Sequence, residues 1–369
     1  MKKKILIISN GHGEDVIASN LIKELKEQCP EYELAVVALV GLGKAYKKVG
    51  HQPSHINPSF PSGGFIRTIK DLVLDLKAGI LANMFNQRKH IKAISNKCEI
   101  CIAVGDIFCL WMAANAKVEN TYFFPTAKSD LFMKHSFIEK WLIKKIAKKS
   151  YPRDQLTTDS FIKDKLNASY LGNPMMDNLR TKRESIQLKA DEILIGFLPG
   201  SRDEAYKNSQ YCLKVAKKLI ADNPKINCCF AKAESLDLNI IAKESGWKID
   251  NKGQIPCLTK DKTSIFFSND FLSVINQATV IIGLAGTANE QAVFLGKPVI
   301  CFEGFGPQTT LKRFQEQKKL MGDKVIVCPK RDISLIVKAI HENLSGPRKH
   351  IKNQAIAQKI VHDIVKSSF

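Results

Sequence analysis

The sequence predicts an α/β protein with two domains, each built around a parallel, doubly wound sheet. A chain of 369 residues with 44% apolar content is long enough for two hydrophobic cores. Short apolar runs typical of buried strands alternate with helical patterns, which favours parallel strands with helices on both faces. This alternation stops in the polar segment Lys182–Asp191 and restarts at Ile193. We therefore expect an N-terminal domain at 1–177, a C-terminal domain at 191–345, and a last helical segment at 346–369.

The first half of the chain supplies the elements of one such domain. Its strand patterns are short and apolar, and glycine turns or helical patterns follow them. We expect strands at Lys4–Ser9, Glu33–Val40, Glu99–Val104 and Thr121–Phe124, and helices at Val16–Gln28, from Gly41 to Gly50, and within Phe65–Ile94 and Phe132–Lys149.

In the second half, the strand pattern Ile193–Leu198 is followed by a small-residue turn that holds an arginine. Gly200, Ser201 and Arg202 lie in this turn, before a further helical pattern. The chain contains 47 Lys and 9 Arg, so composition alone favours a lysine at any given basic position. A guanidinium binds phosphate through two parallel hydrogen bonds, and the amides at a helix start add to this. We expect the turn to bind an anion; the alternative is a surface ion pair of Arg202 with its acidic neighbours.

The strand pattern Ala278–Ile282 leads into a second glycine turn and a helical pattern at Ala288–Leu295. Thr287 can cap this helix, whose first amides and positive dipole end favour phosphate. Glu290, one turn into the helix, can accept two ribose hydroxyl hydrogen bonds. A plain strand-to-helix connection, with Glu290 interacting only with the dipole, has the same pattern. The residues expected to bind a nucleotide here are Gly286, Thr287, Ala288, Asn289 and Glu290.

Three ordered segments resemble signatures of the lipid-A-disaccharide synthase family, and especially of its synthase-related branch. They are Pro199–Arg202, Gly283–Glu290 and Gly172–Asp177. The resemblance implies the GT-B architecture, in which two Rossmann-like domains have parallel sheets facing a central cleft. It implies an inverting glycosyltransferase that uses a nucleotide-activated amino sugar, a UDP-GlcNAc derivative, as its substrate. It also suggests that the last segment, with its apolar residues at helical spacing in Ile351–Val365, crosses back to the N-terminal domain.

Sugar transfer from a nucleotide diphosphate requires stabilisation of the charge on the departing diphosphate. Arg202 and the helix start at 286–289 can supply it, and the chain has no Asp-x-Asp motif, so we expect no metal requirement. The resemblance places Gln308 against the donor sugar, and the alternative is an ordinary turn amide. Cys98 and Cys101 have no second pair at metal-ligand spacing, so we expect no metal or redox cofactor there.

The acceptor hydroxyl must lose its proton to a base, and the N-terminal domain offers three candidates. Asp106 follows the apolar run Ile100–Gly105, at the edge of a parallel sheet that faces the cleft. It resembles the first aspartate of the family's Ile-Asp-Ala-Pro-Asp-Phe-Asn segment, whose second aspartate has no counterpart in this chain. His12 and Glu14 lie in the glycine loop after the first strand, where histidine can titrate near neutral pH and a carboxylate can orient it. The family has Gly-Glu-x-Ser-Gly-Asp where this chain has Asn10–Asp15, so the resemblance does not identify the acceptor.

The net charge of +20 indicates an anionic partner. The chain has no helix-turn-helix, zinc-finger or aromatic single-strand pattern, so we expect no nucleic acid. In Phe65–Ile94 and Phe132–Lys149, apolar stripes alternate with basic residues, which favours peripheral binding to an anionic membrane surface. The alternative is that both are core-facing helices with solvated lysines. Without a signal-peptide pattern or an 18-residue apolar run, we expect a cytoplasmic protein, peripheral on the inner face of the membrane.

We therefore predict a glycosyltransferase that moves a UDP-GlcNAc-derived amino sugar to a lipid-linked or glycolipid acceptor. One alternative is a non-hydrolysing UDP-GlcNAc 2-epimerase, which shares the fold and the donor. Another is a catalytically silent protein that retains the nucleotide-sugar site. A homodimer remains one option for the oligomeric state.

Overall fold

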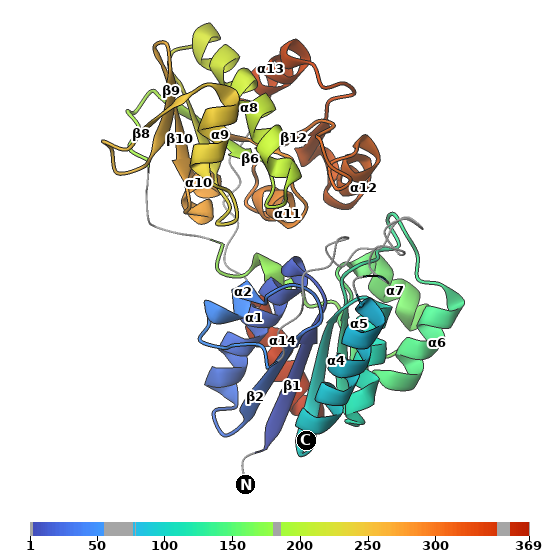
Figure 1. Cartoon of the computed structure of the whole chain (residues 1–369). Helices are drawn as coiled ribbons and strands as arrows, with labels where there is room; N and C mark the ends of the chain where they lie inside the picture. The colour runs from blue at the N-terminus through green and yellow to red at the C-terminus, as the bar shows by residue number, and fades with distance from the viewer. Residues whose placement is uncertain (1–2, 55–76, 78, 180–185, 345–354, 369) are drawn as a thin grey trace. The chain divides into compact units, whose positions relative to one another are not determined.

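The computed structural model describes residues 3–54, 77, 79–179, 186–344 and 355–368. The chain forms two units, each with its own sheet (Figure 1). Unit 1 comprises Met1–Asp177 together with Gln354–Phe369, and unit 2 comprises Asn178–Asn353.

Unit 1 contains a five-stranded parallel sheet in the order β2-β1-β3-β4-β5. Strand β1 pairs with β2 on one side and with β3 on the other, so the strand order reverses between β1 and β3. Doubly wound sheets bind their ligands beyond the carboxyl ends of the strands at such a reversal. The strands are β1 (Lys4–Ser9), β2 (Glu33–Ala38), β3 (Cys98–Gly105), β4 (Asn120–Pro125) and β5 (Lys149–Ser150).

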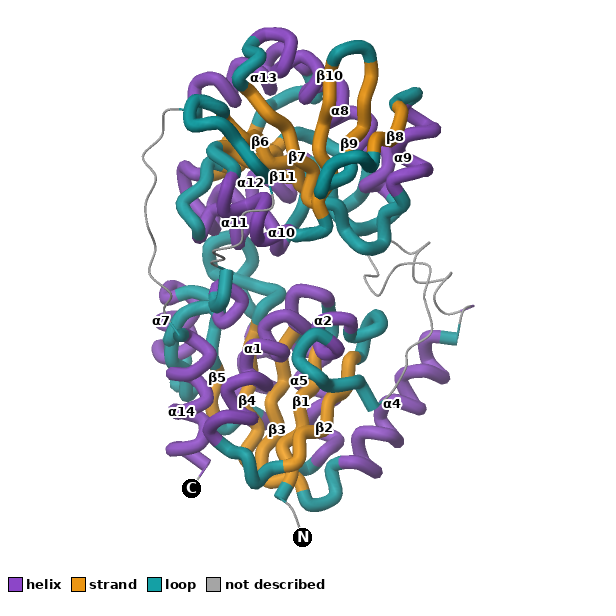
Figure 2. The backbone as a smooth tube through the Cα atoms, turned by 90° about the vertical axis from the view of Figure 1, so that its left-hand side faces the viewer, coloured by secondary structure: helices purple, strands orange, loops and turns teal. Residues whose placement is uncertain are grey.

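Helices cover both faces of this sheet (Figures 1 and 2). Successive β1 residues face opposite layers: Ile5 and Ile7 pack with α1 and α14, whereas Leu6 and Ile8 pack with α4, α5, α6 and α7. Both faces are therefore buried, as expected for a parallel sheet. The helices are α1 (His12–Gln28), α2 (Lys44–Lys47), α4 (Ile80–Ile94), α5 (Ile107–Ala113), α6 (Phe137–Ile146), α7 (Gln155–Lys163) and α14 (Ile356–Ser368), with short 3-10 turns at Ala114–Ala116 and Pro174–Met176.

The carboxylate of Asp177 fixes the start of α14. Its two oxygens accept the backbone amides of Ile356 at 2.9 Å and Ala357 at 2.6 Å, which satisfies two amides of the first turn. Gly172 has φ +106°, and a Cβ at this position would come within 2.9 Å of the Ile356 side chain. The signature segment Gly172–Asp177 thus anchors the C-terminal helix within unit 1.

Unit 2 contains an eight-stranded sheet in the order β13-β12-β11-β6-β7-β10-β9-β8. The strands from β13 to β10 run parallel, and the order reverses between β6 and β11. The strands are β6 (Ile193–Leu198), β7 (Ile226–Ala231), β8 (Lys248–Asp250), β9 (Cys257–Lys260), β10 (Thr263–Ser268), β11 (Val280–Gly283), β12 (Val299–Cys301) and β13 (Val325–Val327). The helices are α8 (Glu204–Asp222), α9 (Leu238–Ser245), α10 (Phe271–Gln277), α11 (Thr287–Phe294), α12 (Leu311–Met321) and α13 (Ile333–Glu342), with a 3-10 turn at Gly322–Lys324.

An antiparallel extension at one edge of this sheet was not predicted from the sequence. Strands β9 and β10 are antiparallel, and β8 continues the pattern. Only two residues, Asp261 and Lys262, join β9 to β10, and Asp261 has φ +56°. So short a connection permits only a hairpin, because a parallel crossover needs a dozen residues or more.

Helix α1 begins earlier than predicted, at His12 instead of Val16. Extended Gly11 precedes it, and the amide of Asp15 donates to the Gly11 carbonyl at 2.8 Å, which closes the first turn. The prediction that His12 and Glu14 lie in a glycine loop is therefore wrong. The extended backbone of Gly11 and its carbonyl, which accepts the Asp15 amide, allow the helix to start at His12.

Helix α6 covers only part of the amphipathic segment Phe132–Lys149. Helix α6 starts with the capping box of Ser136 and Glu139 and ends before extended Ala147. Residues 65–76 and 78 of the other segment lie outside the described residues. In its described helix α4, the buried side chains are Asn83, Gln87 and Ile91, whereas Phe85 is 68% exposed, so the core-facing side mixes polar and apolar residues.

Candidate functional site

The loops after β1 and β3 meet where the strand order of unit 1 reverses. Asn10 follows β1, Asp106 follows β3, and Asn10 Nδ2 donates to Asp106 Oδ1 at 2.6 Å. The packing is tight, because a Cβ on Gly105, with φ +157°, would collide with the Asn10 side chain. Both side chains are partly exposed. A carboxylate thus lies at the sheet edge where such folds bind ligands.

Asp106 also begins helix α5. Its Oδ1 accepts the backbone amide of Cys109 at 3.0 Å, which makes Asp106 the N-cap. Among the described residues both hydrogen bonds go to Oδ1, and Oδ2 accepts none. Asp106 is thus held in place through one oxygen, and the other can accept a hydrogen bond or a proton.

Glu14 lies in the first turn of α1, near Asp106. Thr126 Oγ1 donates to Glu14 Oε1 at 3.0 Å, and Arg153 donates to the Thr126 carbonyl at 2.9 Å. Burial raises the pKa of Glu14 and the Asp106 charge adds to this rise, although Thr126 and Arg153 oppose it. A raised pKa strengthens the carboxylate as a proton acceptor. His12 is the first residue of the same helix, and its side chain lies outside the described part of the structure.

A buried polar network beneath this turn was not predicted from the sequence. Asp15 is 1% exposed, and its Oδ1 accepts the Ser9 hydroxyl at 2.6 Å. The Ser9 hydroxyl also bonds to the Tyr46 hydroxyl, and Asp15 Oδ2 is buried without a hydrogen bond to any described residue. Burial raises the pKa of Asp15 to about 7. Asp15 therefore carries a proton up to neutral pH, directly after Glu14 in the chain.

In unit 2, the two predicted glycine turns meet at the reversal between β6 and β11. The amide of Leu284 donates to the Leu198 carbonyl at 2.9 Å. Gly200 has φ +104°, and a Cβ there would lie 3.3 Å from the Leu284 carbonyl oxygen. Ser201 is exposed and Arg202 is partly exposed in the same turn. Both turns therefore lie at one edge of the sheet.

The start of α11 leaves backbone amides open. Gly286 is its exposed N-cap residue, and no side chain caps the helix. The amides of Asn289 and Glu290 donate to the Gly286 carbonyl at 3.1 and 3.3 Å. Within the described chain the amides of Thr287 and Ala288 donate to no backbone carbonyl, and both residues are partly exposed. Such a helix start favours an anion.

Asn289 was expected among the binding residues, but its side chain lies inside the turn. It is fully buried, and its Nδ2 donates to the Gly283 carbonyl at 3.2 Å and to Gln317 Oε1 at 3.1 Å. A Cβ on Gly283 would collide with Asn289, and Gln317 Nε2 donates to the Ala285 carbonyl at 3.1 Å. Asn289 and Gln317 therefore support the turn from within.

A third loop, Gly304–Thr309, carries Gln308, which is partly exposed. Asn208 of α8 joins this loop to the first turn. Its Nδ2 donates to the Pro199 carbonyl at 2.9 Å, and its Oδ1 accepts the Phe305 amide at 3.0 Å. Asn208 is fully buried, so it fixes the two loops relative to each other. A single asparagine within a helical pattern gives no sequence signal for this role.

In the described part of the chain, no group of three or more His, Cys, Asp or Glu side chains is placed to hold a metal ion. All ten cysteines lie in that part and are free thiols. Burial raises the pKa of Cys98 to about 11 and that of Cys101 still higher, which disfavours the reactive thiolate. Of the helices in the described ranges, none has the length and apolar character needed to cross a bilayer.

Comparison with protein-family models gave no match. One similar curated protein is the lipid-A-disaccharide synthase of Persephonella marina, which is 23% identical over 169 residues. The match covers 43% of this chain and 42% of that protein, so this chain spans less than half the length of the curated relative.

Solved structures are similar over almost the whole chain. A putative UDP-N-acetylglucosamine 2-epimerase from Listeria monocytogenes has a TM-score of 0.63 at 13% identity, covering 100% of this chain and 96% of that one. The UDP-GlcNAc 2-epimerase from Neisseria meningitidis, solved with bound UDP-GlcNAc, has a TM-score of 0.62 at 12% identity. The match covers 99% of this chain and 100% of that one. A calicheamicin glycosyltransferase has a TM-score of 0.62 at 11% identity, and the match covers 100% of this chain and 95% of that one. This chain has the GT-B fold. At these identities the similarity concerns the fold alone. Because one fold can carry many reactions, the reaction has to be inferred from the residues of the site.

Proposed function

We propose that this GT-B protein binds a UDP-sugar in unit 2 and transfers its amino sugar to an acceptor. The observation that carries the proposal is the meeting of two glycine turns at the reversal of strand order, joined by the bond from Leu284 to Leu198. The open amides of Thr287 and Ala288 belong to one turn, and Arg202 belongs to the other. Open amides and a guanidinium at one sheet edge suit a diphosphate.

In the proposed reaction, an acceptor oxygen attacks the anomeric carbon from the side opposite the diphosphate. The bond from that carbon to the diphosphate breaks, and negative charge develops on the leaving group. Arg202 and the α11 amides would stabilise this charge without a metal, because a guanidinium and helix-start amides both bind phosphate oxygens. Glu290 would accept the ribose hydroxyls, and Gln308 would contact the donor sugar.

The acceptor's proton would pass to a carboxylate of unit 1. Asp106 is the first candidate, because Asn10 and the Cys109 amide hold one of its oxygens and leave Oδ2 to accept the proton. Glu14 is the second candidate, because burial raises its pKa. His12 remains the third.

The lipid-linked acceptor is the finer part of the proposal. It is supported by the partial similarity to a lipid-A-disaccharide synthase and by the net charge of +20, which suits an anionic membrane surface. We place the protein in the cytoplasm, peripheral on the inner face of the membrane, and retain a homodimer as an option.

A 2-epimerase is the second candidate, because solved proteins of that name share the fold over nearly their whole length. Incubation with UDP-GlcNAc alone separates the candidates. An epimerase would form the C2 epimer without an acceptor, whereas a transferase would release UDP only when a membrane lipid extract is added. A silent binding protein would bind UDP-GlcNAc and change it under neither condition.

Calorimetry with UDP tests the nucleotide site. Replacing Arg202 by Ala should weaken UDP binding by roughly 1.5 to 3 kcal/mol, about tenfold to 150-fold, because a charge-assisted contact is lost. The matched control is Lys218→Ala, which removes a cation near the far end of α8, where it pairs with Asp222. Equal UDP affinity for the wild type and Arg202→Ala would reject this site.

A further inference from the structure

Exposed apolar side chains gather in and just before helix α6. Of the 15 large apolar side chains that are exposed in the described residues, five lie within 131–141. Exposed apolar side chains that lie together often mark an interaction site. The five, here called the α6 surface, are Leu131 (37% exposed), Met133 (48%), Phe137 (84%), Ile138 (68%) and Trp141 (52%).

This exposure does not reflect a loosely held helix. The capping box of Ser136 and Glu139 fixes the first turn of α6, and Glu139 also pairs with Lys128 at 2.8 Å. Ile143 is 1% exposed in the same core as Ile91 and Phe161. The helix is therefore anchored on the sheet by one side, and its apolar side chains remain uncovered on the other.

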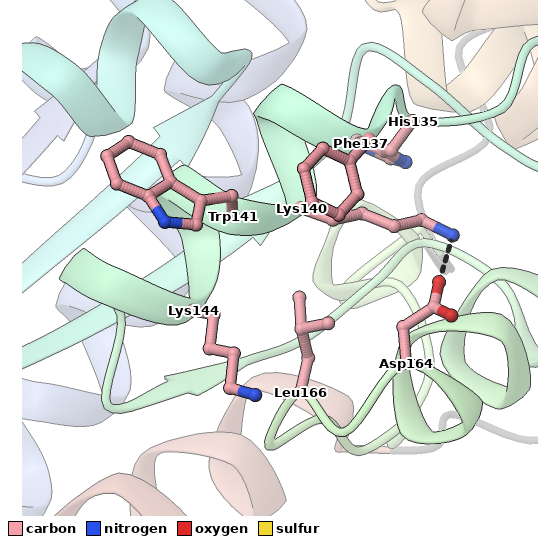
Figure 3. Close-up of a pocket in the computed structure, with 7 residues that line it drawn as sticks. All are labelled: His135, Phe137, Lys140, Trp141, Lys144, Asp164 and Leu166. Carbon is pink, nitrogen blue, oxygen red and sulfur yellow. Dashed lines mark hydrogen bonds and ion pairs between the residues drawn. The ribbon is translucent and has the colours of Figure 1, made fainter.

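A pocket of about 460 Å³ lies beside the α6 surface (Figure 3). Phe137, Trp141 and Leu166 give it apolar walls, and Lys140 pairs with Asp164 across it. Lys144 extends into the same space from α6 (Figure 3). Apolar walls with a cation at the rim suit an amphiphile that has an anionic head.

The positive charge of this region comes from lysines. His135 also lines the pocket, but burial lowers its pKa to about 4, so it is neutral near pH 7. Lys134, Lys144 and Lys145 are exposed and make no ion pair with any described residue. Lys145 Nζ lies 5.2 Å from the centre of the Trp141 ring, which brings a cation and an amphipathic aromatic side chain together.

Two other lysines of the segment Phe132–Lys149 form contacts within unit 1. Lys149, in β5, pairs with Asp363 of α14 at 2.7 Å, and Lys148 donates to Asn120 at 2.7 Å. These two lysines serve contacts within unit 1. A charge test of the α6 surface therefore belongs to Lys144 and Lys145.

We propose that the α6 surface docks on a bilayer containing anionic phospholipid. Phe137, Ile138 and Trp141 enter the boundary between headgroups and acyl chains, and the unpaired lysines bind lipid phosphates. One lipid headgroup binds at the pocket. An apolar face and neighbouring lysines supply apolar burial and attraction to anionic lipid, the two contributions that hold helices in the plane of a membrane interface. The inference rests on the proposed function for its purpose, because a lipid-linked acceptor requires the enzyme at the membrane.

The placement of α6 connects docking to the candidate catalytic residues. The chain leaves β4 at Pro125, and the next residue, Thr126, donates to Glu14. From there ten residues lead to the N-terminus of α6 at Phe137. An extended chain of ten residues spans at most about 36 Å, so this connection limits how far the Glu14 edge of unit 1 can lie from the α6 surface.

Sedimentation of the full-length protein with vesicles tests the proposal. The wild type should bind vesicles of equal parts phosphatidylcholine and phosphatidylglycerol, and bind phosphatidylcholine alone far more weakly. Lys144→Gln/Lys145→Gln should reduce binding to the anionic vesicles by about thirtyfold, at roughly 1 kcal/mol for each lysine. Phe137→Ser/Ile138→Ser should reduce it by at least about tenfold through lost apolar burial. The matched control is Lys318→Gln/Lys319→Gln, an adjacent exposed pair on α12, which should bind like the wild type.

Equal vesicle binding by the wild type and both α6 variants, or no binding by the wild type, would overturn the proposal. A dimer that Phe137→Ser/Ile138→Ser converts to a monomer without lipid would reassign the surface to a second copy. UDP affinity is measured on each variant. Normal UDP binding without vesicle binding would reject this inference alone, whereas vesicle binding without UDP binding would reject the proposed function.

Discussion

The buried carboxyl group of Asp15 should make the stability of unit 1 depend on pH in an identifiable way. Asp15 is 1% exposed, its Oδ1 accepts the Ser9 hydroxyl, and its Oδ2 lacks a hydrogen bond among the described residues. Burial raises its pKa from the ordinary 3.8 to about 7. In the unfolded chain the group loses its proton near pH 3.8, whereas in the fold it keeps the proton to about pH 7.

The sign and size of the effect follow from this difference. Between the two pKa values the folded state holds a proton that the unfolded state has released, so the stability falls as the pH rises. The stability that comes from this proton is fully present below pH 3.8 and is lost once the pH passes about 7. Each pH unit is worth about 1.4 kcal/mol, so the loss from pH 5 to pH 8 is about 2 to 3 kcal/mol. Asp15→Asn stays neutral and can still accept from Ser9, and it should lack this slope.

We would measure urea unfolding of the wild type and Asp15→Asn at pH 5 and pH 8. Pulsed hydrogen exchange at one fixed labelling pH would follow the opening of β1 and α1. The stability of the variant relative to the wild type should rise by about 2 to 3 kcal/mol between these pH values. Asp191→Asn, a surface carboxylate paired with Lys225, is the control and should show no such change. A relative stability of Asp15→Asn that is the same at both pH values would show that the pKa of Asp15 is not raised by folding.

Three further outcomes are expected. Asp106→Asn should lower turnover by about 10² to 10⁴ with unchanged UDP affinity, because asparagine keeps the cap but cannot act as a base; near-normal turnover would transfer the role to Glu14, tested by Glu14→Gln. Transfer activity should persist in EDTA, and complete loss restored by magnesium would contradict stabilisation by Arg202 and α11. Asp177→Ala should lower the free energy of unfolding by about 1 to 3 kcal/mol in urea titrations, because two amides of α14 lose their acceptor.

The features that the sequence predicted are local in the chain. The strand, glycine turn and helix around Gly200, and again around Gly286, follow from residue types that adjoin one another, and the structure has both. The parallel sheets were predicted in the same way, whereas the GT-B architecture was implied by the family resemblance. The start of α1 was misplaced because Gly11 and Gly13 have the pattern of a loop, while the first-turn amides and Gly11 carbonyl allow a helix from His12.

The features that the sequence did not reveal depend on partners far apart in the chain. Asn208 and Phe305 are 97 residues apart, and Asn10 and Asp106 are 96 apart. No spacing rule links such residues, so neither the hydrogen bonds of Asn208 between its two loops nor the bond from Asn10 to Asp106 could be predicted from the sequence. The burial of Asp15 depends on how α1 packs over β1, which a helical pattern alone does not specify.

UDP should bind at the carboxyl edge of the unit 2 sheet. Hydrogen exchange of the full chain with and without saturating UDP tests it most directly, because bound phosphate protects the amides that donate to it. We expect slower exchange in three loops, 199–203, 284–290 and 304–309, and little change at the candidate catalytic turn of Glu14. UDP binding that protects only amides outside these loops would exclude this site, and so would a folded protein that does not bind UDP.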